Sequence, residues 1–254
     1  MDISFEGKKV LVTGASTGIG AAIAEGFASA GAEVAVHYAS NEEAATAVVS
    51  AIQAAGHRAV AIQADLTEPA ASAALISDVE EMLGPIDVLV NNAGSLVGRY
   101  ATGTVSREQY ETVMELNFGS VVALTNAIIP GMRQRRSGSV INVSSVAAYN
   151  GGGPGAALYA ASKGAIVSYT RAVAKEVAGD GVRVNALAPG VIETPFHERF
   201  TAPEAFATMV ATIPAGRAGR PEECVGPTLF LASDELSSYV TGQVIAVNGG
   251  QYFN

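Results

Sequence analysis

The stretch Lys8-Lys9-Val10-Leu11-Val12-Thr13-Gly14-Ala15-Ser16-Thr17-Gly18-Ile19-Gly20 predicts the fold. Its first half is apolar and β-branched and predicts a short strand that ends at Gly14. A helical pattern follows the last glycine and continues to Ala30, before Gly31. Glycines between a first strand and a first helix let the backbone approach a pyrophosphate, which the helix N-terminus can bind. A merely flexible turn is the alternative, because the chain holds 28 glycines.

The rest of the chain alternates between strand and helix patterns. Strands are predicted over 8–13, 32–38, 58–63, 86–90, 139–143, 182–188 and 243–247, and further helices over 41–55, 68–83, 106–132, 158–177 and 221–232. Such alternation predicts right-handed βαβ units. We therefore expect an α/β fold of the Rossmann type: a doubly wound, seven-stranded, mostly parallel sheet with helices on both faces. The whole chain, 1–254, is expected to be one domain, with an irregular substrate loop at about 190–220.

Composition excludes several classes of protein. The chain has 254 residues, of which 49% are apolar and 15% are charged, as in a well-buried globular domain. Its formal net charge of −9 argues against nucleic acid as a partner. The single cysteine, Cys224, excludes an internal disulfide and a cysteine-rich zinc site, so no metal is expected. The segment 1–6 does not resemble a signal peptide, and we expect a cytoplasmic protein that does not enter a membrane.

Tyr159 and Lys163 lie four residues apart in the predicted helix 158–177 and therefore on one face of it. A lysine charge about 4 Å from a phenol is worth roughly 4 kcal/mol at an effective dielectric near 20. That energy lowers the pKa of the tyrosine by about 3 before desolvation takes some of it back. The pair alone is weak evidence, because this spacing is common on surface helices. The pair indicates an active site only if the chain also holds a cofactor site and a partner residue.

Motifs for a cofactor site and for a partner residue both follow in order along the chain. Past the glycine-rich turn come Asp65, Asn91-Asn92-Ala93-Gly94, Asn117, Ser145, Tyr159 with Lys163, Pro189-Gly190 and Thr194. In this order, over about residues 8–250, the chain resembles the short-chain dehydrogenase/reductase family. The resemblance implies a catalytic set of Asn117, Ser145, Tyr159 and Lys163. It implies a cofactor site formed by Gly14, Ser16, Thr17, Gly18, Ile19, Gly20, Tyr38, Ser40, Asn41, Asp65, Leu66, Asn92, Ala93, Gly94, Tyr159, Lys163, Pro189, Gly190, Ile192 and Thr194.

The end of the second strand bears on the choice of cofactor. An acidic residue there would bind the ribose hydroxyls and repel a 2′-phosphate. This strand ends His37-Tyr38-Ala39-Ser40-Asn41, without an acid, which favours NADP. Because no Arg or Lys is close in sequence, Ser40 and Asn41 would have to hold the phosphate with neutral hydrogen bonds, with His37 as a further candidate. NAD is the alternative cofactor.

The predicted chemistry is hydride transfer between a nicotinamide and a substrate carbon, with Tyr159 as the general acid and base. By resemblance, Ser145 holds the substrate oxygen, Lys163 also binds the nicotinamide ribose, and Asn117 holds a water that links Lys163 to solvent. Ser144 is the neighbouring alternative to Ser145. Strand alternation points the two serines to opposite sides. The family pattern Asn-Val-Ser-Ser favours Ser145.

Substrate and assembly are less constrained by the sequence. The resemblance favours a 3-oxoacyl-type or small ketone reductase, with a sugar or polyol dehydrogenase as the alternative. A catalytically silent nucleotide-binding regulator is the alternative of another class. Arg99, Tyr149 and His197 lie in predicted site loops. An apolar lid and ordinary loop packing are both open for Phe196, Phe200, Phe206 and Met209. The helix 158–177 is small or apolar nearly all round, which indicates a subunit interface and, by resemblance, a homotetramer.

Overall fold

A computed structural model describes residues 3–68 and 70–253 of the chain. Seven strands form one sheet in the order β3-β2-β1-β4-β5-β6-β7, and every pairing between neighbours is parallel. The predicted Rossmann-type fold is therefore confirmed. The strands are β1 (Lys9–Val12), β2 (Glu33–Tyr38), β3 (Ala59–Gln63), β4 (Val88–Asn91), β5 (Gly138–Val143), β6 (Val182–Pro189) and β7 (Val244–Val247).

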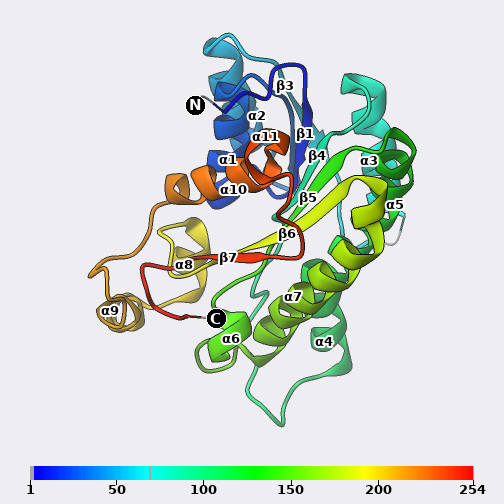
Figure 1. Cartoon of the computed structure of the whole chain (residues 1–254). Coiled ribbons are helices and arrows are strands. Elements are labelled where there is room, and N and C mark those ends of the chain that lie inside the picture. The colour runs from blue at the N-terminus through cyan, green and yellow to red at the C-terminus, as the bar shows by residue number, and fades with distance from the viewer. Residues whose placement is uncertain (1–2, 69, 254) are drawn as a thin grey trace.

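Helices cover both faces of the sheet (Figure 1). On one face α1 (Gly18–Ser29), α2 (Glu42–Ala54) and α10 (Val225–Ala232) pack through Phe27, Ile52 and Leu231. On the other, α3 (Ala71–Leu83), α5 (Ser120–Arg135) and α7 (Ala157–Val177) pack through Val79, Leu124 and Val177. Because both faces are buried, the strands are nearly continuous apolar runs. That is why their positions could be read from the sequence.

Several predicted helix boundaries are confirmed by their caps. Asn41 caps α2, since its side chain accepts a hydrogen bond from Ala44 N–H. A capping box of Ser106 and Gln109 begins α4 (Arg107–Met114), at the predicted start of the helix 106–132. The expected start of α3 at Glu68 is wrong, because the helix begins at Ala71; Pro69, inside that range, lies outside the described residues.

The predicted helix 106–132 is three elements, because a turn of π-helix, η1 (Glu115–Gly119), separates α4 from α5. The stretch 190–220 is also more regular than expected. It contains α8 (Pro195–Phe200) and α9 (Pro203–Ala211), each with proline in its first turn. Short elements complete the described chain: α6 (Ala147–Asn150), η2 (Ala178–Asp180), η3 (Pro221–Cys224) and α11 (Asp234–Ser237).

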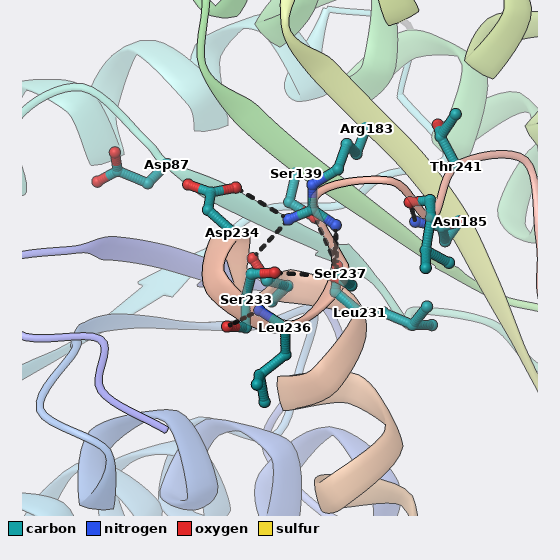
Figure 2. Close-up of polar contacts among 12 residues, drawn as sticks. Asp87, Ser139, Arg183, Asn185, Leu231, Ser233, Asp234, Leu236, Ser237 and Thr241 are labelled. Atoms are coloured by element: carbon teal, nitrogen blue, oxygen red, sulfur yellow. Dashed lines mark hydrogen bonds and ion pairs between the residues drawn. The ribbon is translucent and has the colours of Figure 1, made fainter. Parts of the chain in front are cut away.

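Arg183, near the start of β6, fastens α10 and α11 to the sheet (Figure 2). One terminal nitrogen of its guanidinium donates to the carbonyl of Leu231 and to Ser237 Oγ, and the other to the carbonyl of Ala232 and Asp234 Oδ1. The residue is only 7% exposed. A buried cation with four acceptors is a satisfied structural group.

One stretch, Arg107–Arg135, is long and apolar enough to cross a membrane by length and composition alone. In the described structure, 44% of its most apolar window is buried within the fold. Core helices of soluble proteins pass the same test, so it is weak evidence for a membrane.

Candidate active site

A cavity of about 440 Å³ lies where the turn after β1 and the loops after β4, β5 and β6 meet. Ligands bind at this edge in open α/β sheets. Of the residues expected to bind cofactor or act in catalysis, its walls hold Gly14, Thr17, Gly18, Ile19, Gly20, Asn92, Gly94, Ser145, Tyr159, Lys163, Pro189, Gly190, Ile192 and Thr194. The expected residues that are not among its lining are Ser16, Tyr38, Ser40, Asn41, Asp65, Leu66, Ala93 and Asn117.

The glycine turn is braced by the loop after β4. Thr13 Oγ1 accepts hydrogen bonds from the N–H groups of Asn92 and Ala93, both at 3.0 Å. In return, Asn92 Nδ2 donates to the carbonyls of Thr13 and Gly14, both at 2.9 Å. Gly14 has a φ of 60°, and a Cβ there would stand 2.9 Å from Ala93 Cα. Only glycine fits this turn without strain.

The N-terminus of α1 suits an anionic ligand. Thr17 is its N-cap residue, but its side chain makes no capping hydrogen bond, and the first turn holds no acidic residue. Its N–H groups are therefore left without a side-chain cap where Thr17, Gly18 and Ile19 line the cavity. A dinucleotide pyrophosphate fits this end of the cavity.

At the end of β2, one of the residues considered for phosphate binding, His37, faces the protein interior. Tyr38 is half-buried and Ser40 and Asn41 are exposed, so their side chains are accessible. His37, by contrast, is 2% exposed. Its ring nitrogens face Gly14 N–H and the carbonyl of Ala64 at 3.0 and 3.1 Å. The prediction that His37 holds a phosphate is therefore wrong, because its ring is committed to the protein interior.

Tyr159, Lys163 and Ser145 come together at the centre of the cavity. A hydrogen bond to Ser145 lowers the pKa of Tyr159, but burial outweighs it and raises that pKa to about 12. Burial also lowers the pKa of Lys163 to about 8. Lys163 Nζ donates to the Val143 carbonyl at 2.8 Å and lies 5.7 Å from the centroid of the Tyr159 ring. The expected lowering of the tyrosine pKa is therefore not found, because desolvation of the phenol is the dominant effect on it.

The two neighbouring serines have different partners. Ser144 is 2% exposed, and its hydroxyl donates to the backbone carbonyl of Lys163 at 2.8 Å. Ser145 faces Tyr159, and its Oγ accepts a hydrogen bond from Ala147 N–H at 3.1 Å. This geometry favours Ser145 over Ser144 as the group available to a substrate.

Asn117 lies in the π-helical turn and is fully buried. Its side chain accepts from Ser95 N–H and donates to the carbonyls of Ser95 and Val113. It therefore ties the loop after β4 to the helix. A Cβ added at Gly94 would lie 2.7 Å from Asn117 Oδ1 and 3.1 Å from Lys163 Nζ, so this glycine allows the three segments to meet.

The outer part of the cavity is covered by α8 and α9. The Phe196 ring centroid lies 5.7 Å from that of Tyr159 and 5.2 Å from that of Phe200, and Phe206 packs against His197. Phe196, His197 and Met209 line the cavity, whereas Phe200 and Phe206 lie behind them. This apolar cover thus includes a histidine, and burial lowers the pKa of His197.

Arg99 connects the segments around this cover. Its Nε donates to the carbonyl of Phe200, at the end of α8, and one terminal nitrogen donates to the carbonyl of Pro154. The adjacent Tyr100 N–H donates to the carbonyl of Gly155 at 3.0 Å. Arg99 therefore joins three loops at the mouth of the cavity.

Some lining residues were missed by sequence reasoning. They come from the loop after β4, the ends of β5 and β6, α6 and the loop after it, the ends of α8 and α9 and the C-terminal tail: Leu96, Val143, Val146, Ala147, Asn150, Gly152, Gly153, Ala156, Val191, Pro195, Thr201, Thr212 and Gln251. Gln251 Nε2 donates to Thr212 Oγ1 at 3.3 Å, which joins the tail to the cover. No local motif marks these positions, since only the folded chain brings the tail to the cavity.

Known proteins are similar to this chain over nearly its whole length. A family model described as enoyl-(acyl carrier protein) reductase matches residues 14–251. The chain is 41% identical over 240 residues to a 3-oxoacyl-[acyl-carrier-protein] reductase of Synechocystis sp., an alignment covering 94% of this chain and 95% of the relative.

Two solved structures match over nearly the whole length. One is a putative NAD(P)-dependent gluconate 5-dehydrogenase from Beutenbergia cavernae with bound NADP, 40% identical, with a TM-score of 0.92 and 99% of each chain covered. The other is a 3-oxoacyl (acyl-carrier-protein) reductase from Agrobacterium tumefaciens with NADP bound, 36% identical, with a TM-score of 0.91 and 98% and 96% covered. The fold and the matches together define an oxidoreductase of the Rossmann type. The chain belongs to the short-chain dehydrogenase/reductase family.

Proposed function

We propose that the chain is an NADP(H)-dependent reductase of a 3-oxoacyl thioester or small ketone, working on a carbonyl or secondary alcohol. The observation that carries this proposal is one cavity shared by the glycine turn and by Ser145, Tyr159 and Lys163. Relatives with 3-oxoacyl-[acyl-carrier-protein] reductase activity in their names support the substrate class.

Each side chain of the site has its own role in the proposed carbonyl reduction. The bound cofactor supplies the hydride. Ser145 donates a hydrogen bond to the substrate oxygen, and Tyr159 donates the proton that this oxygen needs as it becomes an alcohol. With a pKa raised to about 12, the Tyr159 phenol is protonated at neutral pH and ready to act as the acid. Lys163 supplies positive charge to stabilise the phenolate that remains. Asn117 keeps the loop after β4 against Lys163 and, by family resemblance, holds the water that returns a proton.

The preference for NADP is supported by the end of β2. Tyr38, Ser40 and Asn41 put no carboxylate where the ribose hydroxyls would bind. Two related structures have NADP bound. We expect kcat/KM with NADPH to exceed that with NADH when both are measured with one carbonyl substrate. A strong preference for NADH would refute this choice.

A sugar or polyol is the second candidate substrate. The gluconate dehydrogenase neighbour and the polar groups Asn150, Thr201, Thr212 and Gln251 in the cavity wall favour it. A panel of acetoacetyl thioesters, small ketones, sugar acids and polyols, followed by NADPH absorbance, separates the candidates. Turnover of any member excludes a catalytically silent regulator, which would bind nucleotide without consuming it.

We also propose a cytoplasmic homotetramer. Ala161, Ser168 and Ala172 are exposed on α7, and such small side chains let another helix approach closely. Light scattering after gel filtration is expected to give four times the chain mass of 25.8 kDa. A monomer at micromolar concentration would contradict the assembly without affecting the proposed chemistry.

A further inference from the structure

His37 is a buried histidine in contact with the glycine turn. It is 2% exposed in a strand whose neighbouring residues Val34, Ala35 and Val36 are apolar. Its Nδ1 accepts a hydrogen bond from Gly14 N–H at 3.0 Å, so the ring proton must lie on Nε2. Nε2 then donates to the Ala64 carbonyl at 3.1 Å. Burial lowers the pKa of His37, which keeps the ring neutral at physiological pH.

These bonds connect three segments. Gly14 begins the turn after β1, His37 lies at the end of β2, and Ala64 follows β3 and directly precedes Asp65 and Leu66. Backbone hydrogen bonds from Ala15 N–H to the His37 carbonyl and from Ala64 N–H to the Tyr38 carbonyl run beside them, at 2.8 and 3.1 Å. The imidazole therefore spans the ends of adjacent strands.

Gly14 is held from both sides. His37 accepts from its N–H group, and Asn92 Nδ2 donates to its carbonyl. An apolar side chain in place of His37 would leave the N–H group of Gly14 and the carbonyl of Ala64, both partly buried, without these partners. The turn would then be free to relax away from the position that a pyrophosphate requires.

We propose that His37 is a positioning residue for the dinucleotide, because its imidazole holds the glycine turn in register with the segment that follows β3. The inference rests on the proposed function, since it assumes that NADP(H) binds along this turn. His37 touches no reacting atom, and its effect is expected on cofactor affinity.

The test compares three substitutions in the full-length protein, with NADPH affinity measured by fluorescence titration. His37→Leu is expected to raise the Kd about tenfold and to raise KM for NADPH at least fivefold more than it changes kcat. His37→Asn offers Oδ1 as an acceptor for Gly14 N–H and is expected to return the Kd to within about threefold of wild type.

Asn185→Leu is the matched control. Asn185 is also fully buried, accepts from a backbone N–H (Gln243) and donates to a backbone carbonyl (Val240), but it lies outside the cavity lining. It is expected to lower the melting temperature as His37→Leu does while leaving the Kd for NADPH unchanged.

A folded His37→Leu protein with wild-type NADPH affinity would overturn the proposal. So would an equal rise in Kd in His37→Asn, or in Asn185→Leu. Wild type that binds NADPH but reduces no carbonyl compound would contradict the proposed function and leave the His37 comparison intact. Wild type that binds neither NADPH nor NADH would contradict both.

Discussion

All strands of the sheet begin at one side, here called the amino edge, and end at the other, the carboxyl edge. A buried cation lies at each of these two sides. At the amino edge, Arg183 is surrounded by the carbonyls of Leu231 and Ala232, Ser237 Oγ and the Asp234 carboxylate. At the carboxyl edge, Lys163 is 3% exposed and, within the part of the chain that the structure describes, donates one hydrogen bond, to the Val143 carbonyl. Both residues are buried, but only Arg183 has an ion-pair partner.

The difference separates a group that holds the fold from a group held ready for a ligand. Four hydrogen bonds offset the free energy that Arg183 loses when it is removed from water. The single hydrogen bond of Lys163 does not offset its desolvation, and the pKa of Lys163 is lowered because its charge is buried without enough acceptors. Unfavourable burial of this kind clusters at functional sites. We therefore expect substitutions at the amino edge to change stability and substitutions at the carboxyl edge to change turnover.

The largest expected effect is on turnover at the carboxyl edge. Tyr159→Phe removes the proton donor and is expected to lower kcat by a factor on the order of 10³. NADPH affinity should stay within about twofold, because no cofactor phosphate contact is removed. Tyr110→Phe is the control, since Tyr110 is 42% exposed on α4, and it should keep full activity. Substantial turnover in Tyr159→Phe would refute its role as the acid.

The next largest effect is on stability at the amino edge. Arg183→Met removes four hydrogen bonds and leaves the carbonyl of Ala232 without its donor, while Ser139 and Ser237 still donate to the carbonyl of Leu231. At about 1 kcal/mol for each bond, it is expected to lower the unfolding free energy by about 3–5 kcal/mol. Arg183→Lys keeps the charge but loses the forked geometry of the guanidinium. We therefore expect a smaller loss of unfolding free energy, and a protein stable enough for its unfolding to be followed. Unfolding is followed by circular dichroism at one protein concentration, alongside kcat of the folded enzyme. A fall in kcat without a loss of stability would contradict the structural role.

A smaller effect is expected at the mouth of the cavity. Arg99→Ala removes the bonds to Phe200 and Pro154, each worth about 1 kcal/mol, and should loosen the cover. We expect KM for the carbonyl substrate to rise several-fold while the Kd for NADPH is unchanged. Arg199→Ala serves as the control, because Arg199 lies over the Phe200 ring and, among the described residues, has no hydrogen bond to another loop. An unchanged KM would show that Arg99 does not hold the cover.

The fold, and the meeting of Tyr159 and Lys163 in one cavity, could be predicted because local signals carry them. Val10 to Val12 and Val88 to Val90 are apolar runs of buried parallel strands, and the glycine turn directly follows the first of them. Tyr159 and Lys163 share a helix face, so their spacing alone puts them together.

The remaining features depend on contacts between distant segments. Gln251 reaches the cavity only because the chain after β7 folds back toward Thr212. His37 looks accessible in the sequence, yet its ring turns inward to Gly14, 23 residues away. The pKa of Tyr159 depends on how strongly the folded protein buries it, a quantity that spacing along a helix does not contain.

The most direct test of the contrast between the two cations is the stability of Lys163→Met. Burial lowers the pKa of Lys163 from 10.5 to about 8, so keeping it charged at pH 7 costs about 3 kcal/mol. Between pH 8 and 10.5 the unfolded wild type binds more protons than the folded one, so wild-type stability rises across that interval.

Urea unfolding at fixed protein concentration, at pH 7 and again near pH 10, measures the difference directly. At pH 7 Lys163→Met is predicted to be more stable than wild type by about 2 kcal/mol, after about 1 kcal/mol is subtracted for the lost bond to Val143. The gap should narrow near pH 10, while turnover is lost at both values. A variant that is less stable than wild type at pH 7, as Arg183→Met is expected to be, would contradict the account.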